Sequence, residues 1–176
     1  MDRESPREDR FERLLDAHAA ALRRLCSGHR RDPSDQQDLF QEIAVALWTA
    51  LPRFRGDSSE RTWLYRVAHN TAISFRANRR RRISHEQPAV EWKSNSNPET
   101  DAMAHEQSRQ LWVAVQQLPL SDRQITVLYL EGMTAAEIEA VTGLSSGNVA
   151  TRLTRIRQRL AARLRGQQHL KCDECE

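Results

Sequence analysis

A length of 176 residues with 39% hydrophobic content suits one ordinary domain or two small ones, and argues against a large enzyme scaffold. The net charge of +3 is unevenly spread: residues 1–82 hold 17 basic and 12 acidic side chains, residues 83–108 hold 1 and 5, and residues 109–176 hold 9 and 7. No apolar run approaches the roughly 20 residues that cross a bilayer, the N-terminus lacks a signal-peptide core, and three scattered cysteines give no disulfide framework. We therefore expect a cytoplasmic protein with reduced thiols and no membrane insertion.

Apolar residues recur at helical spacing along most of the chain, while glycine and proline are scarce at six each. An all-α fold is expected. In the N-terminal half the apolar faces predict three helices: one at about residues 9–27, one that starts near Asp32 or Ser34 and ends near Leu51, and one that starts near Ser58 or Ser59 and ends at Arg82. Gly28 suits the end of the first helix, Pro33 the first turn of the second, and Ser58 or Ser59 the start of the third. Residues 9–82 are predicted to form one small helical domain.

The helical periodicity stops between residues 83 and 105, where Pro, Ser, Asn and acidic residues dominate. This composition is typical of a flexible acidic linker. Beyond it we expect a helix at about residues 107–117 and a second helix opened by the capping box Ser121-x-x-Gln124. A tight helix pair follows, so residues 106–166 are predicted to form a second small helical domain, with a tail at residues 167–176.

The tight pair has the pattern of a helix-turn-helix. Thr134-x-x-Glu137 is a capping box, Gly143 stands where a short helix must turn, and the next helix has a continuous apolar face. Its polar side carries Ser145, Ser146, Asn148, Arg152 and Arg155. Arg can bond guanine and Asn can bond adenine in the major groove, so this helix is predicted to read duplex DNA. The alternative is a solvated helical hairpin, and Glu139, where such motifs usually place a small residue, is a departure from the pattern.

Aromatic and basic residues are interleaved in the N-terminal half. Four aromatics fall within the 22 residues 54–75, which also carry three arginines, are flanked by Arg53 and Arg76 and precede an arginine run: Phe54, Trp63, Tyr65 and Phe75. Rings that stack on bases and cations that follow the backbone suit single-stranded nucleic acid. The alternative is that the aromatics are core residues, which is at least as good an interpretation for Phe75 and Trp63.

Three segments together resemble the extracytoplasmic function (ECF) group of bacterial sigma factors, the two-domain members of the sigma-70 family. They are DLFQEIAVALW (38–48), FRGDSSERTWLYRVAHNTAISFRANRRRR (54–82) and LPLSDRQITVLYLEGMTAAEIEAVTGLSSGNVATRLTRIRQRL (118–160). The resemblance implies a transcription factor with two helical domains, a helix-turn-helix in the second, and promoter-specific initiation by RNA polymerase. It implies no covalent chemistry and no cofactor.

The resemblance also implies three sets of contact residues. Residues matching the helix that docks on the β′ clamp helices of core RNA polymerase are Asp38, Gln41, Glu42 and Trp48. Residues matching the stretch that melts the minus-10 element and holds the non-template strand are Phe54, Arg55, Trp63, Tyr65, Arg66, Asn70, Ser74, Arg76, Arg79 and Arg80. Residues matching the reader of the duplex minus-35 element are Thr134, Ser145, Ser146, Asn148, Thr151, Arg152 and Arg155. An anti-sigma partner is implied in the same way.

Two residues depart from the family pattern at DNA-contact positions: Ser74 where many relatives have aspartate, and Ala150 where a basic residue is common. The class of function is therefore better supported than any promoter sequence. The rival hypothesis is a freestanding helix-turn-helix repressor that binds duplex operators as a dimer. A metal-dependent nuclease is disfavoured because the six histidines are dispersed.

The C-terminal tail carries a possible set of zinc ligands, His169, Cys172 and Cys175. Three ligands do not close a tetrahedral structural site. An exposed tail without metal is the favoured interpretation, and metal binding or redox sensing is the alternative.

Overall fold

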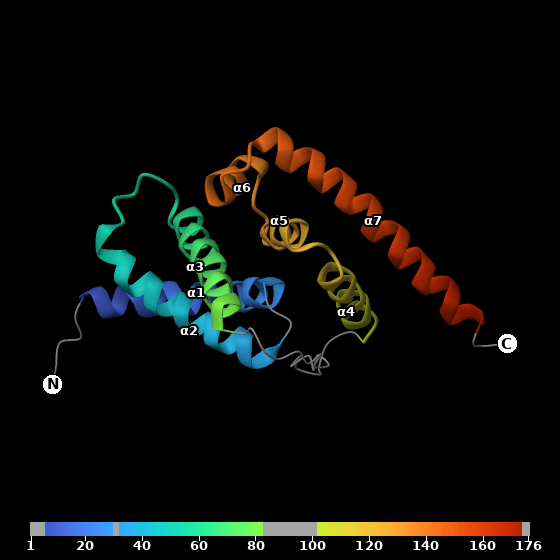
Figure 1. The fold of residues 1–176 in the computed structure, drawn as a ribbon, viewed down its shortest axis with the longest axis horizontal. Coiled ribbons are helices and arrows are strands. Elements are labelled where there is room, and N and C mark those ends of the chain that lie inside the picture. Colours follow the sequence, from blue (N-terminus) through green and yellow to red (C-terminus); the bar gives the residue numbers. More distant parts are fainter. Residues whose placement is uncertain (1–5, 30–31, 83–101, 174–176) are drawn as a thin grey trace.

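The structure is a computed structural model that describes residues 6–29, 32–82 and 102–173 (Figure 1). Within these ranges the regular elements are all helical, which confirms the expected fold class. In chain order they are α1 (Pro6–His29), α2 (Pro33–Ala50), the short 3-10 helix η1 (Leu51–Arg53), α3 (Glu60–Arg82), α4 (Ala102–Gln116), α5 (Leu120–Leu130), α6 (Ala135–Thr142) and α7 (Ser146–Asp173).

The N-terminal half is a three-helix unit in which α2 packs against both α1 and α3. The expected apolar faces form its interior, with Leu22, Leu39, Ile43 and Leu64 at 0% exposure. The start of α2 follows the prediction, since Pro33 lies in the first turn. Asp32 caps it by accepting the Ser34 backbone N–H at 2.8 Å.

Sequence reasoning offered Ser58 and Ser59 as possible caps of α3, and the structure shows which of the two is the cap. Ser59 Oγ accepts the backbone N–H of Thr62 at 3.1 Å, so Ser59 is the capping residue. The side chain of Ser58 makes only a long bond to the Ser59 carbonyl, at 3.4 Å.

Two helix boundaries differ from the prediction in the C-terminal half. Helix α4 begins at Ala102, earlier than expected. The predicted capping box at Ser121 and Gln124 is wrong, because α5 begins at Leu120 and its N-cap is Pro119, which makes no side-chain cap bond. Ser121 therefore lies inside the first turn, and Gln124 Nε2 instead lies 3.1 Å from His29 Nδ1 of α1.

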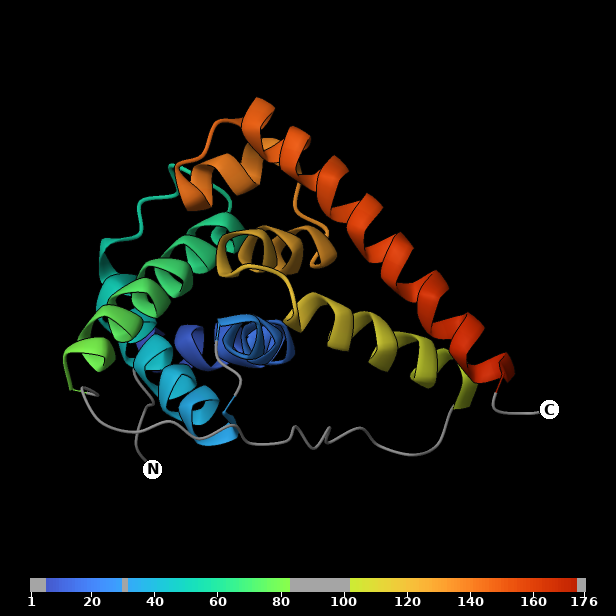
Figure 2. The ribbon, with the colours of Figure 1, turned by 45° about the vertical axis from the view of Figure 1, so that its right-hand side comes forward.

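The helix-turn-helix is formed by α6 and α7. The capping box at Thr134 and Glu137 is present, and Gly143 ends α6 in the left-handed conformation at φ 74°. Glycine suits this turn because an L side chain is strained there. Helix α7 is long and packs its apolar face on α4, α5 and α6, as Figure 2 shows. The residues that carry this face are Val149, Leu153, Ile156 and Leu160, all buried.

The two halves pack against each other, with α1 beside α5 and α3 beside α6 (Figures 1 and 2). We refer to this arrangement as the closed packing. Glu131, the C-cap residue of α5, lies at its centre: Arg24 donates to its carboxylate from Nη2 at 2.8 Å and also from Nε. Arg61 donates to the Glu131 backbone carbonyl. Tyr65 donates its hydroxyl to Glu131 Oε2 at 3.4 Å.

Helices α1 and α5 also approach each other closely at the backbone of Gly28. Gly28 was expected to end α1, but the helix continues to His29 and Gly28 is buried against α5. A methyl group at Gly28 would lie 2.7 Å from Val127 Cγ2, so the absence of a side chain permits the contact. Gln116 also donates from Nε2 to the Ser27 carbonyl. Among the described residues, none of the helices has the length and apolar character needed to cross a membrane.

Candidate functional site

One face of α2 presents polar side chains to solvent. Asp38, Gln41 and Glu42 are exposed, and their spacing places them on one side of the helix. Val45 continues this face and is the most exposed large hydrophobic residue among those described, at 62%. Sequence reasoning missed Val45. The sequence did contain a signal for its exposure, because Val45 lies three residues after Glu42 and outside the buried stripe of α2.

Trp48, expected on the same surface, is only half-exposed. Its ring meets that of Phe11 edge-on, with centroids 5.2 Å apart. The Arg7 guanidinium lies 3.9 Å from the Trp48 ring centroid, and Arg7 donates to the Trp48 carbonyl at 2.7 Å. The structure therefore places Trp48 under the N-terminal turns of α1, at the margin of the acidic face.

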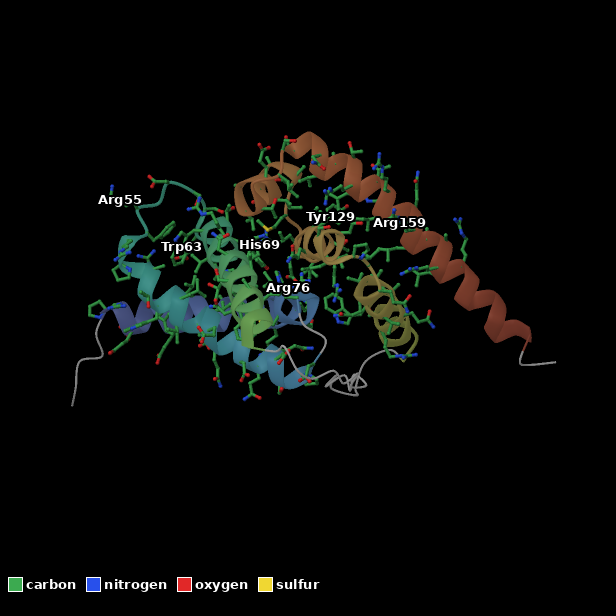
Figure 3. The ribbon with its side chains drawn as sticks, viewed as in Figure 1. Arg55, Trp63, His69, Arg76, Tyr129 and Arg159 are labelled. Carbon is green, nitrogen blue, oxygen red and sulfur yellow. The ribbon has the colours of Figure 1, made fainter. Side chains whose placement is uncertain are left out.

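A second exposed surface runs along α3. Arg66, Asn70 and Ser74 are all exposed, and their four-residue spacing makes a single stripe. Ile73 lies beside it with 49% exposure and was not identified from the sequence. Arg55 lies in the loop before α3 and Arg76, half-buried, lies near its C-terminal end (Figure 3). The side chains of Arg79 and Arg80 lie outside the described residues.

The aromatic residues expected at this surface are largely interior. Trp63 is 6% exposed and Tyr65 is 1% exposed. Phe54, half-buried, stacks on Trp63 with ring centroids 4.9 Å apart. The core interpretation thus holds for Trp63, and Phe75 is half-buried against the core. Burial and the nearby Glu131 carboxylate raise the pKa of Tyr65 to about 12, so its hydroxyl stays protonated as a donor.

A pair of histidines, missed by sequence reasoning, lies where the buried face of α3 meets the end of α1. His69 is 4% exposed and its ring centroid is 5.7 Å from that of His29. Burial lowers the pKa of His69, because desolvation disfavours the imidazolium. The neutral form therefore prevails at neutral pH. The only signal in the sequence was helical periodicity, which places His69 on the buried side of α3 and its neighbour Asn70 on the exposed side.

The N-terminal half of α7 carries the third surface. Ser145, Asn148, Thr151 and Arg155 are exposed, and Ser146 is half-buried. The Thr134 hydroxyl is engaged in its own cap: it donates to Glu137 Oε2 at 2.9 Å and accepts the Glu137 N–H. The Glu137 carboxylate also accepts the Thr134 backbone N–H at 2.8 Å. This bond and the one from the Thr134 hydroxyl lower the pKa of Glu137, since both favour its charged form.

Glu139, the departure from the helix-turn-helix pattern, has a defined role. Its side chain is exposed and Oε2 accepts the backbone N–H of Ser146 at 2.8 Å. The first turn of α7 is therefore capped from α6, across the turn at Gly143. The negative charge of the Glu139 carboxylate also interacts favourably with the positive N-terminal end of the α7 helix dipole.

Arg152, expected on the DNA-facing side, is turned toward its own domain. Its Nε donates to Asn148 Oδ1 at 3.0 Å, and its Nη1 lies 3.7 Å from Asp122 Oδ1. Asp122 Oδ2 also lies 3.3 Å from Arg159 Nη1. Asp122, at the start of α5, thus joins two arginines of α7.

An aromatic–cation pair lies on the same half of the molecule. Arg157 donates to the Tyr129 hydroxyl at 2.6 Å, and its guanidinium lies 4.8 Å from the ring centroid. Figure 3 shows Tyr129 on α5 and Arg159 farther along α7. Within the described ranges no group of three or more His, Cys, Asp or Glu residues could hold a metal. The His169 and Cys172 side chains and all of Cys175 lie outside what the structure describes.

Comparisons with known proteins identify the family of both halves of the chain. The family model described as Sigma-70 region 2 matches residues 14–82, and the model described as Sigma-70, region 4 matches residues 108–160. The chain is 35% identical over 135 residues to the ECF RNA polymerase sigma-E factor of Escherichia coli (strain K12), covering 70% of this chain and 71% of that protein. It is 32% identical over 138 residues to the RNA polymerase sigma-H factor of Pseudomonas aeruginosa, covering 72% of each.

Two solved structures are similar over most of the chain. CnrH, solved in complex with the cytosolic domain of CnrY, has a TM-score of 0.62 and 26% identity, covering 89% of this chain and 88% of CnrH. The sigma factor RpoE from Bartonella quintana, solved in complex with the anti-sigma factor NepR, has a TM-score of 0.69 and 20% identity, covering 88% of this chain and 96% of RpoE, and shares the fold. The chain therefore belongs to the ECF sigma factors of the sigma-70 family.

Proposed function

We propose that this ECF sigma factor binds core RNA polymerase through α2, opens the minus-10 element with α3 and reads the duplex minus-35 element with α7. The observation that carries the proposal is the capped helix-turn-helix of α6 and α7, whose second helix exposes polar and basic groups at its N-terminal end. This is the part of a recognition helix that meets base edges in the major groove.

The polymerase-binding surface is the exposed face of α2. Asp38 and Glu42 supply negative charge, Gln41 supplies a donor and an acceptor, and Val45 supplies apolar area. A helical partner with a basic rim and an apolar centre suits this face, as the β′ clamp helices would. Exposed ion pairs alone contribute little, so Val45 is expected to add to the affinity.

The minus-10 surface is the exposed stripe of α3. Arg66 can contact phosphate, Asn70 and Ser74 can bond bases, and Ile73 can pack on an unstacked base. Three aromatics were expected to contact the minus-10 element: Phe54, Trp63 and Tyr65. Trp63 and Tyr65 are buried, so only Phe54 offers a partly exposed ring on this surface. We propose that Trp63 supports Phe54 from beneath.

Engaging both promoter elements requires the closed packing to open. The two elements are named for positions 25 bases apart, which is about 85 Å along B-DNA at 3.4 Å per base step. The longest of the described helices, α7, has 28 residues and spans only about 42 Å at 1.5 Å per residue. With α3 beside α6, the two DNA-binding surfaces lie too close together for both elements. We propose that the halves separate on polymerase.

The same packing suggests control by a second protein. CnrH and RpoE were solved in complexes with CnrY and NepR, and this chain resembles both over most of its length. We propose that an anti-sigma factor holds this chain in the closed packing.

A run-off transcription assay with core polymerase tests the proposal. The wild-type chain should give a promoter-dependent transcript. Glu42→Arg should abolish it by reversing the charge of the α2 face, whereas Glu12→Arg, at an exposed acid on α1, should not. Duplex binding without any promoter-dependent transcript from the wild-type chain would favour the repressor instead.

A further inference from the structure

Arg152 is held on two sides by neighbours in its own domain. Its Nε donates to Asn148 Oδ1 at 3.0 Å, one helical turn earlier on α7. Its Nη1 lies 3.7 Å from Asp122 Oδ1 on α5. The Arg152 side chain retains 34% exposure and the Asp122 side chain only 17%. The guanidinium is therefore fixed between a shielded carboxylate and an exposed amide.

The chemistry of the pair determines how the Asn148 amide is turned. Arginine has five N–H donors and no acceptor, so the atom of Asn148 that faces Arg152 must be its oxygen. The NH₂ group then points away from the guanidinium. The amide oxygen has a second lone pair, so the amide edge can still make a two-bond contact with a base.

We propose that Arg152 is a positioning residue, and that Asn148 is the base reader which it orients through the chain Asp122–Arg152–Asn148. This inference rests on the proposed role of α7 as the reader of the minus-35 duplex. It assigns to Arg152 a task different from the direct DNA contact that the family resemblance implies. The Asp122 carboxylate, which Arg159 shares, offsets part of the Arg152 charge, and in this role Arg152 makes no direct phosphate contact.

Arg155 provides the matched control. It is exposed on the same helix, and within the described residues its side chain makes no hydrogen bond or ion pair. An arginine without an internal partner is available to contact a base or phosphate directly. The two arginines therefore predict different results in one experiment.

The experiment uses holoenzyme made from core polymerase and the full chain. A duplex library randomised at the minus-35 element first identifies the sequence that the wild-type chain selects. Binding is then measured on duplexes changed one base pair at a time, for wild type, Asn148→Ala, Arg152→Ala, the double variant, Arg152→Lys and Arg155→Ala. A good two-bond amide–base contact is worth roughly 5- to 150-fold in discrimination.

The positioning role predicts that Asn148→Ala and Arg152→Ala lose discrimination at the same base pair, and that the double variant loses no more than Asn148→Ala alone. Arg152→Lys should lose it too, because a lysine keeps the charge but not the two-sided geometry. The salt dependence of binding should be unchanged in Arg152→Ala, whereas loss of one phosphate contact lowers the slope by about 1. Arg155→Ala should affect a different base pair or lower that slope.

The inference is overturned if Arg152→Ala affects a base pair that Asn148→Ala leaves intact, if the two losses add in the double variant, or if Arg152→Lys restores wild-type binding. A wild-type holoenzyme that selects no duplex sequence would overturn the proposed function itself, before any variant is compared.

Discussion

The closed packing depends on the missing side chain at Gly28, so Gly28→Ala is expected to open it. The added methyl would lie 2.7 Å from Val127 Cγ2 and 3.6 Å from Val127 Cβ. Overpacking of this kind costs about 1–3 kcal/mol, which lowers the ratio of closed to open molecules by about 5- to 140-fold. Helix α1 is not weakened, because Ala is favoured over Gly in a helix by up to about 1 kcal/mol.

Small-angle X-ray scattering of the free chain measures this change directly. Gly28→Ala should show a larger radius of gyration than wild type, while its circular dichroism should keep the wild-type helical content. Gly28→Ala combined with Val127→Ala removes the methyl groups that collide, so the compact dimension should return. Superimposable scattering curves for wild type and Gly28→Ala would refute the reasoning, since Val127 would then have absorbed the methyl without separating the halves.

Three further outcomes are expected. Glu139→Ala should lower the free energy of unfolding by about 0.5–2 kcal/mol in urea titrations by removing the cap on Ser146, and Glu139→Gln, which keeps an acceptor, should lower it less. The pKa of His69 in the folded state lies below the ordinary 6.5, so the free energy of unfolding should fall as the pH drops below about 6.5, by up to about 1.4 kcal/mol per pH unit. His69→Gln should flatten this dependence. Identical pH profiles of unfolding for wild type and His69→Gln would contradict the expectation. Burial raises the pKa of the Cys26 thiol to about 12, so its peptide should resist alkylation at pH 8 until the chain unfolds, as mass spectrometry would reveal.

Local patterns predicted the elements well where the sequence has one dominant signal. The Thr134 capping box and the left-handed Gly143 fix the helix-turn-helix, and the apolar stripes identify the buried faces of all three N-terminal helices. The exposed stripe of α3 follows from the same periodicity. These features depend on residues close together in the chain.

The errors arose where distant segments meet. Gly28 matched a helix stop, but it lies inside α1 and is buried where α5 approaches its backbone. Ser121 and Gln124 matched a capping box, but the N-cap of α5 is Pro119 and Gln124 faces His29. Tyr65 matched a base-stacking residue, but Glu131 and the closed packing cover it. No local pattern reports contacts between residues so far apart in the sequence.

Two of the polar contacts of the closed packing use backbone carbonyls at helix ends. Ser27, in the last turn of α1, accepts from Gln116, and Glu131, the C-cap of α5, accepts from Arg61. Carbonyls at helix C-termini have no partner within their own helix, and water can satisfy them equally well. Separating the halves therefore exchanges protein donors for solvent and leaves no buried acceptor empty, so the net cost of each bond is small. These two hydrogen bonds therefore add little to the free energy needed to separate the halves and can re-form when the halves meet again.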